Sequence, residues 1–216
     1  MSVNDDRITP AGERAATAEV ATASSIADPA PLGLAAFALT TFLLSAANAG
    51  WMTKASGDAW LGYAFIYGGI IQLLAGMWEF RNRNVFGATA FSTYGGFWIG
   101  LFLWARLVAP TIKSPAVASH DLAWILLAFA IINTILLLMS TQVTMAVFLV
   151  FLTLEATEIL LLIGGFLNQA PGDGATQIGG YIGVLTALVA WYTAAAGIAN
   201  GLPGPLKLPV GRPMLT

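Results

Sequence analysis

The sequence predicts an all-α membrane protein that crosses the bilayer six times. Hydrophobic residues make up 57% of the 216 residues and charged residues only 9%, whereas about a quarter of an average soluble domain is charged. The few charged residues stand between long uncharged stretches. Six spans of ~20 residues would use ~120 residues, slightly more than half of the chain. We therefore expect one compact helical membrane domain and little else.

Charged residues bound the first three predicted spans. These spans lie between Asp28 and Lys54, between Asp58 and Glu79, and between Arg83 and Arg106. Each interval is close to the length that a helix needs to cross the hydrocarbon core. We expect the three helices at approximately residues 32–53, 59–80 and 84–108.

Helix-breaking segments bound the last three predicted spans. The fourth runs from Asp121 to a polar run at residues 140–142, and segments rich in Gly and Pro follow the fifth and sixth. We expect these helices at approximately residues 121–139, 143–167 and 176–200, within a transmembrane domain of residues 28–200.

The two ends of the chain are predicted to be cytoplasmic tails. Residues 1–27 are polar and rich in Ala, Ser and Thr, without the basic start and apolar run of a signal peptide. We expect this segment to be disordered. Residues 201–216 form the carboxyl-terminal tail. An even number of spans places both tails on one side, which gathers six of the nine Lys and Arg residues and is therefore predicted to be the cytoplasm.

Several classes of protein are disfavoured by the residues that the chain lacks. With no cysteine and one histidine, a catalytic metal site is not expected, and the spans contain no lysine for a retinal Schiff base. Neither a phosphate-binding glycine loop nor the basic surface of a nucleic-acid-binding protein is present. We therefore expect neither an enzyme nor a cofactor.

Polar residues inside the predicted spans are the candidates for function. Glu155 and Glu158 are the costliest, because a carboxylate at bilayer depth is penalised by several kcal/mol and so marks function by default. The alternative is that one or both are protonated, or paired at a subunit contact. The uncharged candidates, which can bond within the helices or line a solute path, are Thr40, Thr41, Asn48, Gln72 and Thr157. Two rows of glycines, Gly96 with Gly100 and Gly179 with Gly183, predict close helix packing.

A motif at the start of the first span resembles a known family. The segment Asp28-Pro29-Ala30-Pro31-Leu32-Gly33-Leu34 is similar to the Asn-Pro-Ala-Pro-Leu-Gly-Leu signature of the acetate uptake transporter family. The likeness continues through the first three spans in Tyr67-Gly68-Gly69, Thr89-Ala90-Phe91 and Phe97-Trp98, and ends near Gly211.

The resemblance implies a path for small carboxylates. Family members carry acetate and other short monocarboxylates, some also succinate, often with protons, as multi-pass proteins of the plasma membrane (the inner membrane in a bacterium). Each is a six-helix protomer with its own pore, and the protomers assemble as a hexamer. The family constriction of Phe, Tyr and Leu falls by motif on Phe37, Tyr94 and Leu154, with Gln72 and Thr157 as polar contacts.

Two features of the chain depart from the expected family pattern. Asp28 replaces the signature Asn, and Glu155 and Glu158 stand where we expect uncharged residues. Because successive helix positions turn by about 100°, Glu158 lies about 40° from Leu154 and should be near the path. Our hypothesis is that Glu158, with Glu155, couples proton and carboxylate movement. The opposite hypothesis is that the pair retunes or disables the pore. A passive channel for a neutral solute such as an amide or ammonia, and a scaffold or sensor without flux, remain as alternatives.

Overall fold

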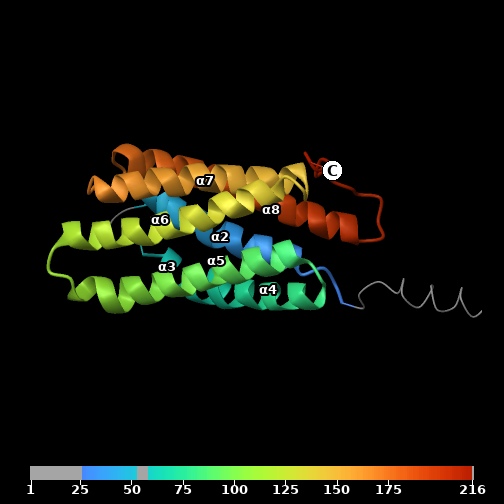
Figure 1. Ribbon diagram of the computed structural model, residues 1–216, viewed down its shortest axis with the longest axis horizontal. Helices are drawn as coiled ribbons and strands as arrows, with labels where there is room; N and C mark the ends of the chain where they lie inside the picture. Colours follow the sequence, from blue (N-terminus) through green and yellow to red (C-terminus); the bar gives the residue numbers. More distant parts are fainter. Residues whose placement is uncertain (1–25, 53–57, 216) are drawn as a thin grey trace, which may run out of the picture.

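The computed structural model describes residues 26–52 and 58–215, and within these ranges it contains helices and no strand. The helices lie side by side along one direction and form a long bundle (Figure 1). Most of the predicted disordered tail, residues 1–25, and Lys54 of the first loop lie outside the described residues.

The first helix, α2 (Ala30–Asn48), begins directly after the proline-containing motif. Asp28 takes the place of a helix cap, since its Oδ1 accepts a hydrogen bond of 3.0 Å from the Ala30 backbone N–H. The helix ends at Asn48 and does not reach residue 53, because Gly50 follows it with a φ of 78°. Glycine adopts this left-handed conformation without the steric cost that other residues meet.

The second and third helices are interrupted by wide π-helical turns. The second consists of α3 (Trp60–Tyr63), the π-helix η1 (Ala64–Ile71) and α4 (Gln72–Arg81). The third consists of α5 (Val85–Leu103), the π-helix η2 (Trp104–Val108) and the short 3₁₀ helix η3 (Ala109–Thr111). Asn84 caps α5, because its side chain accepts a hydrogen bond from the Gly87 N–H at 3.1 Å.

The last three helices are α6 (Pro115–Ser140), α7 (Met145–Phe166) and α8 (Gly174–Gly201). The sequence-based start of α6 at residue 121 is wrong, since the helix begins at Pro115. Proline suits a first helical turn, where its missing N–H would have no partner in any case. The charged residue Asp121 therefore lies within α6 and does not mark its start.

Five of the helices in the described part of the chain are long and apolar enough to cross a membrane. They are Ala30–Asn48, Trp60–Arg81, Pro115–Ser140, Met145–Phe166 and Gly174–Gly201. The remaining long helix, α5, is rich in Gly, Ser, Thr and aromatic residues. The Gly, Ser, Thr, Tyr and Trp residues lower its mean hydropathy, whereas its phenylalanines raise it.

Small residues set the closest helix contacts. The bundle packs α2 against α8, α8 against α7, α7 against α6 and α4 against α5. A Cβ atom at Gly183 would overlap Ser45 of α2, and one at Gly179 would lie 3.0 Å from Leu161 of α7, so this predicted row is a packing face. The other predicted row points away from the bundle, since Gly96 and Gly100 have no neighbour within 4 Å among the described residues.

The carboxyl-terminal segment, residues 202–215, lies against the helix ends as an ordered strap. Lys207 Nζ donates to the free carbonyl of Leu202 at 2.6 Å, and Asn200 holds the Leu208 N–H at 2.9 Å. The Ala146 N–H at the start of α7 donates to Val210 O, and Met214 N–H donates to Thr141 O. The strap therefore joins the ends of α6, α7 and α8, at the same end of the bundle where α2 begins (Figure 1).

Candidate functional site

Two cavities lie in the centre of the bundle, and they meet at three side chains. The larger cavity, of about 270 Å³, is lined by residues near the loop end of the bundle, including Asn48, Trp60 and Gln169. The smaller cavity, of about 90 Å³, lies toward the end of the bundle where α2 begins, and Ala30, Asn84 and Val143 are among the residues that line it. We call them the outer and the inner cavity. The residues that line both are Phe37, Tyr94 and Leu154.

These three residues come from three different helices and form an apolar wall. Phe37 lies on α2, Tyr94 on α5 and Leu154 on α7, and each is at most 5% exposed. The Phe37 and Tyr94 rings meet edge to face, with centroids 5.7 Å apart. The structure thus brings together the three residues that the family resemblance selected as a constriction.

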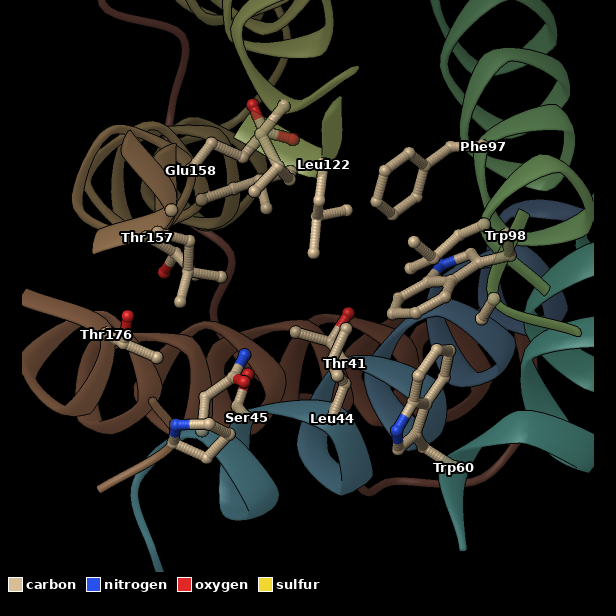
Figure 2. Close-up of a pocket in the computed structure, with 18 of the residues that line it drawn as sticks. Thr41, Leu44, Ser45, Trp60, Phe97, Trp98, Leu122, Thr157, Glu158 and Thr176 are labelled. Carbon is tan, nitrogen blue, oxygen red and sulfur yellow. The ribbon is translucent and has the colours of Figure 1, made fainter. Parts of the chain in front are cut away.

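Three residues that line the outer cavity each have a buried polar atom without a hydrogen-bond partner in the described part of the chain. These atoms are Thr41 Oγ1, Trp98 Nε1 and Glu158 Oε2. Figure 2 shows the three side chains around the cavity, with Leu122 and Phe97 as apolar neighbours. The indole N–H is a donor only and the threonine hydroxyl can donate. Because an unpaired buried polar group is costly, these atoms fit a polar ligand that is small and partly apolar.

The other predicted polar residues of the outer cavity are less available. Asn48 and Thr157 line the cavity. The Thr157 hydroxyl, however, donates to the Thr153 carbonyl at 2.8 Å and lies 3.2 Å from the Thr186 hydroxyl. Thr157 can therefore offer a ligand only the remaining acceptor capacity of its oxygen.

The inner cavity is lined by parts of the sequence motifs. Ala30 and Leu34 of the proline-containing motif, with Gln72 of α4, form part of its surface. Gln72 is buried and its Oε1 atom has no partner among the described residues. Two other residues of the motif pack against neighbouring helices. A Cβ at Gly33 would lie 2.7 Å from the Phe91 ring of α5, and Pro31 contacts Gly197 of α8.

A chain of hydrogen bonds connects the apolar wall to the two glutamates of α7, Glu155 and Glu158. Tyr94 Oη lies 2.9 Å from Asn133 Oδ1 and 3.1 Å from Glu158 Oε1. Asn133 Nδ2 donates to Glu155 Oε2 at 2.7 Å and to the Phe151 carbonyl at 3.1 Å. The Thr134 hydroxyl lies 2.7 Å from Glu155 Oε1 and 2.9 Å from the Ala130 carbonyl, and it can donate to either. Glu158 faces the outer cavity, whereas Glu155 faces α6 and lines neither cavity.

The structure corrects the expectation for Thr40 and adds two residues. Thr40 lines neither cavity, because it packs against Gly68 and its hydroxyl donates to the Ala36 carbonyl at 3.0 Å. Residues that sequence reasoning did not assign to the site are Trp98 and Asn133. Asn133 could have been found as the one amide in the apolar run Ile131-Ile132-Asn133-Thr134-Ile135.

Apolar helices long enough for a bilayer, with two central cavities separated by an apolar wall, define a multi-pass membrane protein of channel-like architecture. Residues 11–212 match the GPR1/FUN34/yaaH family. The chain therefore belongs to this family.

Several relatives of the chain are named as transport proteins. It is 40% identical to acetate permease A of Emericella nidulans, over 87% of this chain and 67% of the relative. It is 38% identical to ammonia transport outward protein 2 of Saccharomyces cerevisiae, over 81% and 62%. It is 33% identical to the succinate-acetate/proton symporter SatP of Escherichia coli, over 87% and 97%. The chain thus spans less than two thirds of some fungal relatives but nearly all of the bacterial one.

A solved structure has the same fold. The bacterial acetate channel SatP superimposes with a TM-score of 0.77 and 30% sequence identity, and the match covers 87% of this chain and 100% of the channel.

Proposed function

We propose that the protein transports acetate and related short monocarboxylates across a membrane, with succinate as a further substrate. The observation that carries the proposal is the shared lining of the two cavities by Phe37, Tyr94 and Leu154. An apolar wall that separates two chambers can exclude hydrated ions and still admit a small acid when its side chains move. The names of the relatives and of the solved channel support acetate as the substrate.

The outer cavity offers chemistry that suits a monocarboxylate. Trp98 N–H and Thr41 O–H can donate to the two carboxyl oxygens, while Leu122 and Phe97 supply an apolar surface for the methyl group. Neither donor carries a fixed positive charge. Binding can therefore be weak enough for release, as conduction requires. On the inner side, Gln72 is the corresponding polar contact.

Glu158 is the group that we propose to couple protons to the carboxylate. It is 3% exposed and lies in the wall of the outer cavity, next to Tyr94. An ionised Glu158 would repel an approaching acetate, since like charges a few ångströms apart interact strongly away from water. A protonated Glu158 would not repel it, and it could donate a hydrogen bond or its proton.

The proposed protomer has six spans, with both tails in the cytoplasm, and six protomers form the transporter in the plasma membrane. The sixth span is α5, which supplies Tyr94 to the central wall. Two outward-facing features support assembly: the open row of Gly96 and Gly100, and Glu155, whose hydrogen-bond partner Thr134 is exposed on the protomer. A neighbouring protomer would shield this carboxylate from lipid.

Uptake of labelled acetate into proteoliposomes tests the function. An inward proton gradient is imposed and then collapsed, and leakage through empty liposomes is subtracted. Protein-dependent uptake that falls when the gradient collapses is the expected result. Uptake that follows the acetate gradient alone would support acetate transport and contradict its coupling to protons. The absence of protein-dependent uptake, in protein that elutes as a folded species, would contradict the proposal.

A second candidate is a passive channel for ammonia or another small neutral solute. It is favoured by the name of one yeast relative, ammonia transport outward protein 2. This candidate predicts flux of methylamine, the neutral analogue of ammonia, that acetate does not compete with. The carboxylate proposal predicts competition by acetate.

A further inference from the structure

The Tyr94 hydroxyl has one proton to donate and two neighbouring oxygen atoms that can accept it. Asn133 Nδ2 faces the Phe151 carbonyl, which can only accept, so the orientation of the Asn133 amide is fixed and its Oδ1 must face Tyr94. Glu158 Oε1 is the second neighbour of the same hydroxyl, at 3.1 Å. A tyrosine hydroxyl has one proton to donate. It can satisfy Asn133 Oδ1 or an ionised Glu158, and not both.

The chain of hydrogen bonds is complete only when Glu158 carries a proton. Glu158 then donates to Tyr94, Tyr94 donates to Asn133, and Asn133 donates to Glu155. Glu155 Oε2 accepts from Asn133 at 2.7 Å, and its Oε1 lies 2.7 Å from the Thr134 hydroxyl, whose one proton can go to Glu155 or to the Ala130 carbonyl at 2.9 Å. Neither contact requires a proton on Glu155. When Glu158 is ionised, Tyr94 turns its proton toward Glu158. Asn133 Oδ1 is then left buried without a donor, which is costly.

We propose that Glu158, Tyr94 and Asn133 form a proton-operated switch in which Asn133 is the positioning residue. Protonation of Glu158 from the outer cavity moves the hydroxyl proton of Tyr94 from Glu158 to Asn133. The same step changes the charge of Glu158 from −1 to 0, and a monocarboxylate can then approach Tyr94. Release of the proton reverses both changes. This inference rests on the proposed function, and it names the residue that makes carboxylate entry depend on a proton.

Few other titratable or charged groups lie near Glu158 in the described part of the chain. Helices α2, α5 and α8 contain no charged residue, and α6 contributes only His120 and Asp121, near its first turns. On α7 the other ionisable group is Glu155, one turn before Glu158. Among the residues that line the outer cavity, the titratable groups are Glu158 and Tyr94. Glu158 lines this cavity, and its Oε2 atom has no hydrogen-bond partner among the described residues, so Oε2 is the atom at which we propose that a proton is exchanged.

The test compares two variants that each remove one donor to Glu155. Asn133→Leu also removes the acceptor of Tyr94, whereas the control Thr134→Val leaves Tyr94 untouched. Initial acetate uptake is measured in proteoliposomes over a series of external pH values, with empty liposomes subtracted. We expect the N133L profile to move toward acid by about one pH unit, because Tyr94 then donates to ionised Glu158 without loss elsewhere. The T134V profile should keep its midpoint, and Glu158→Gln should be flat. If N133L fails to assemble, Asn133→Ala tests the same acceptor.

A spectroscopic measurement separates the switch from the transport proposal. The infrared carbonyl stretch of a protonated carboxyl group is followed against pH in purified protein, and E158Q assigns it to Glu158. We expect this band to disappear at lower pH in N133L than in the wild type and in T134V. Equal titration of N133L and wild type, or no Glu158 band at any pH, would overturn the switch. Absence of uptake in a wild type that shows the expected band would overturn the transport function and leave the switch in place.

Discussion

At the scale of single residues, the outer cavity depends on donors without charge. Trp98 is 3% exposed, and its N–H has no partner among the described residues. Trp98→Phe keeps the aromatic surface and removes this donor. We expect the KM for acetate to rise about five-fold, the effect of one neutral hydrogen bond, with little change in stability. Uptake kinetics in proteoliposomes measure it. Trp124→Phe, at an outward-facing tryptophan that is 62% exposed, is the matched control.

Phe37 should govern the width of the path. Its ring meets Tyr94 edge to face at 5.7 Å, and it lines both cavities. Phe37→Ala removes most of one side of the wall. We therefore expect uptake of butyrate relative to acetate to rise several-fold, since a larger opening discriminates less by size. The control is Phe42→Ala on the same helix, where the ring packs at a tilt against Trp191 and lines neither cavity. Equal selectivity in the two variants would argue against Phe37 as a constriction.

The sequence indicated some of these residues for physical reasons and missed others. Phe37, Tyr94 and Leu154 could be selected by motif, and the structure places them on one wall. Trp98 belongs to a motif, but no local sequence pattern predicts that its N–H has no partner among the described residues. Asn133 becomes important only because α6 lies beside α7 and Tyr94 points between them. Thr40 and Thr41 are both threonines of α2 and look alike in the sequence. Because successive helix positions turn by about 100°, Thr40 points toward η1 instead of the cavity.

At the scale of helices, adjacent glycines of α5 have opposite surroundings. A Cβ at Gly95 would lie 2.7 Å from the Leu73 backbone nitrogen, whereas one at Gly96 would have no neighbour within 4 Å in the described protomer. Gly95→Ala must push the second helix away from α5. We expect its Tm to fall by about 5 °C, the effect of moderate overpacking. In dissociated protomers, where the proposed contact at this row is absent, Gly96→Ala should be neutral or raise the Tm slightly, since alanine favours the helix. Thermal denaturation in detergent distinguishes the two, and equal losses would mean that α5 packs differently.

Helix boundaries were less predictable than the helices themselves. Apolar length identified where helices exist, because a span needs a minimum number of apolar residues. The ends were decided by other effects: Pro115 starts α6 before the charged Asp121, and Gly50 ends the turn that follows α2. The strap of residues 202–215 was expected only as a tail. Its order depends on carbonyls at the end of α8 that Lys207 can reach.

At the scale of the whole molecule, the arrangement of helices places charge asymmetrically. The end of the bundle where α2 begins and the strap lies contains Arg81, Arg83, Lys207 and Arg212, while the opposite end contains Arg106 and Lys113 among the described residues. Lys and Arg are enriched on the cytoplasmic side of membrane proteins. The strap should therefore be cytoplasmic and the outer cavity should face away from the cytoplasm.

Single cysteines can test this orientation directly, because the native chain has none. Lys113→Cys lies in the loop before α6, and Arg212→Cys lies in the strap. In intact cells, a maleimide that cannot cross the membrane should label K113C and leave R212C unlabelled. After lysis it should label both, which shows that each thiol is reactive. The reverse pattern in intact cells would invert the protein in the membrane. Glu158 would then exchange protons with the cytoplasm, and the pH that sets its protonation would be the cytoplasmic one, while the direction of coupled carboxylate movement would still follow the proton gradient.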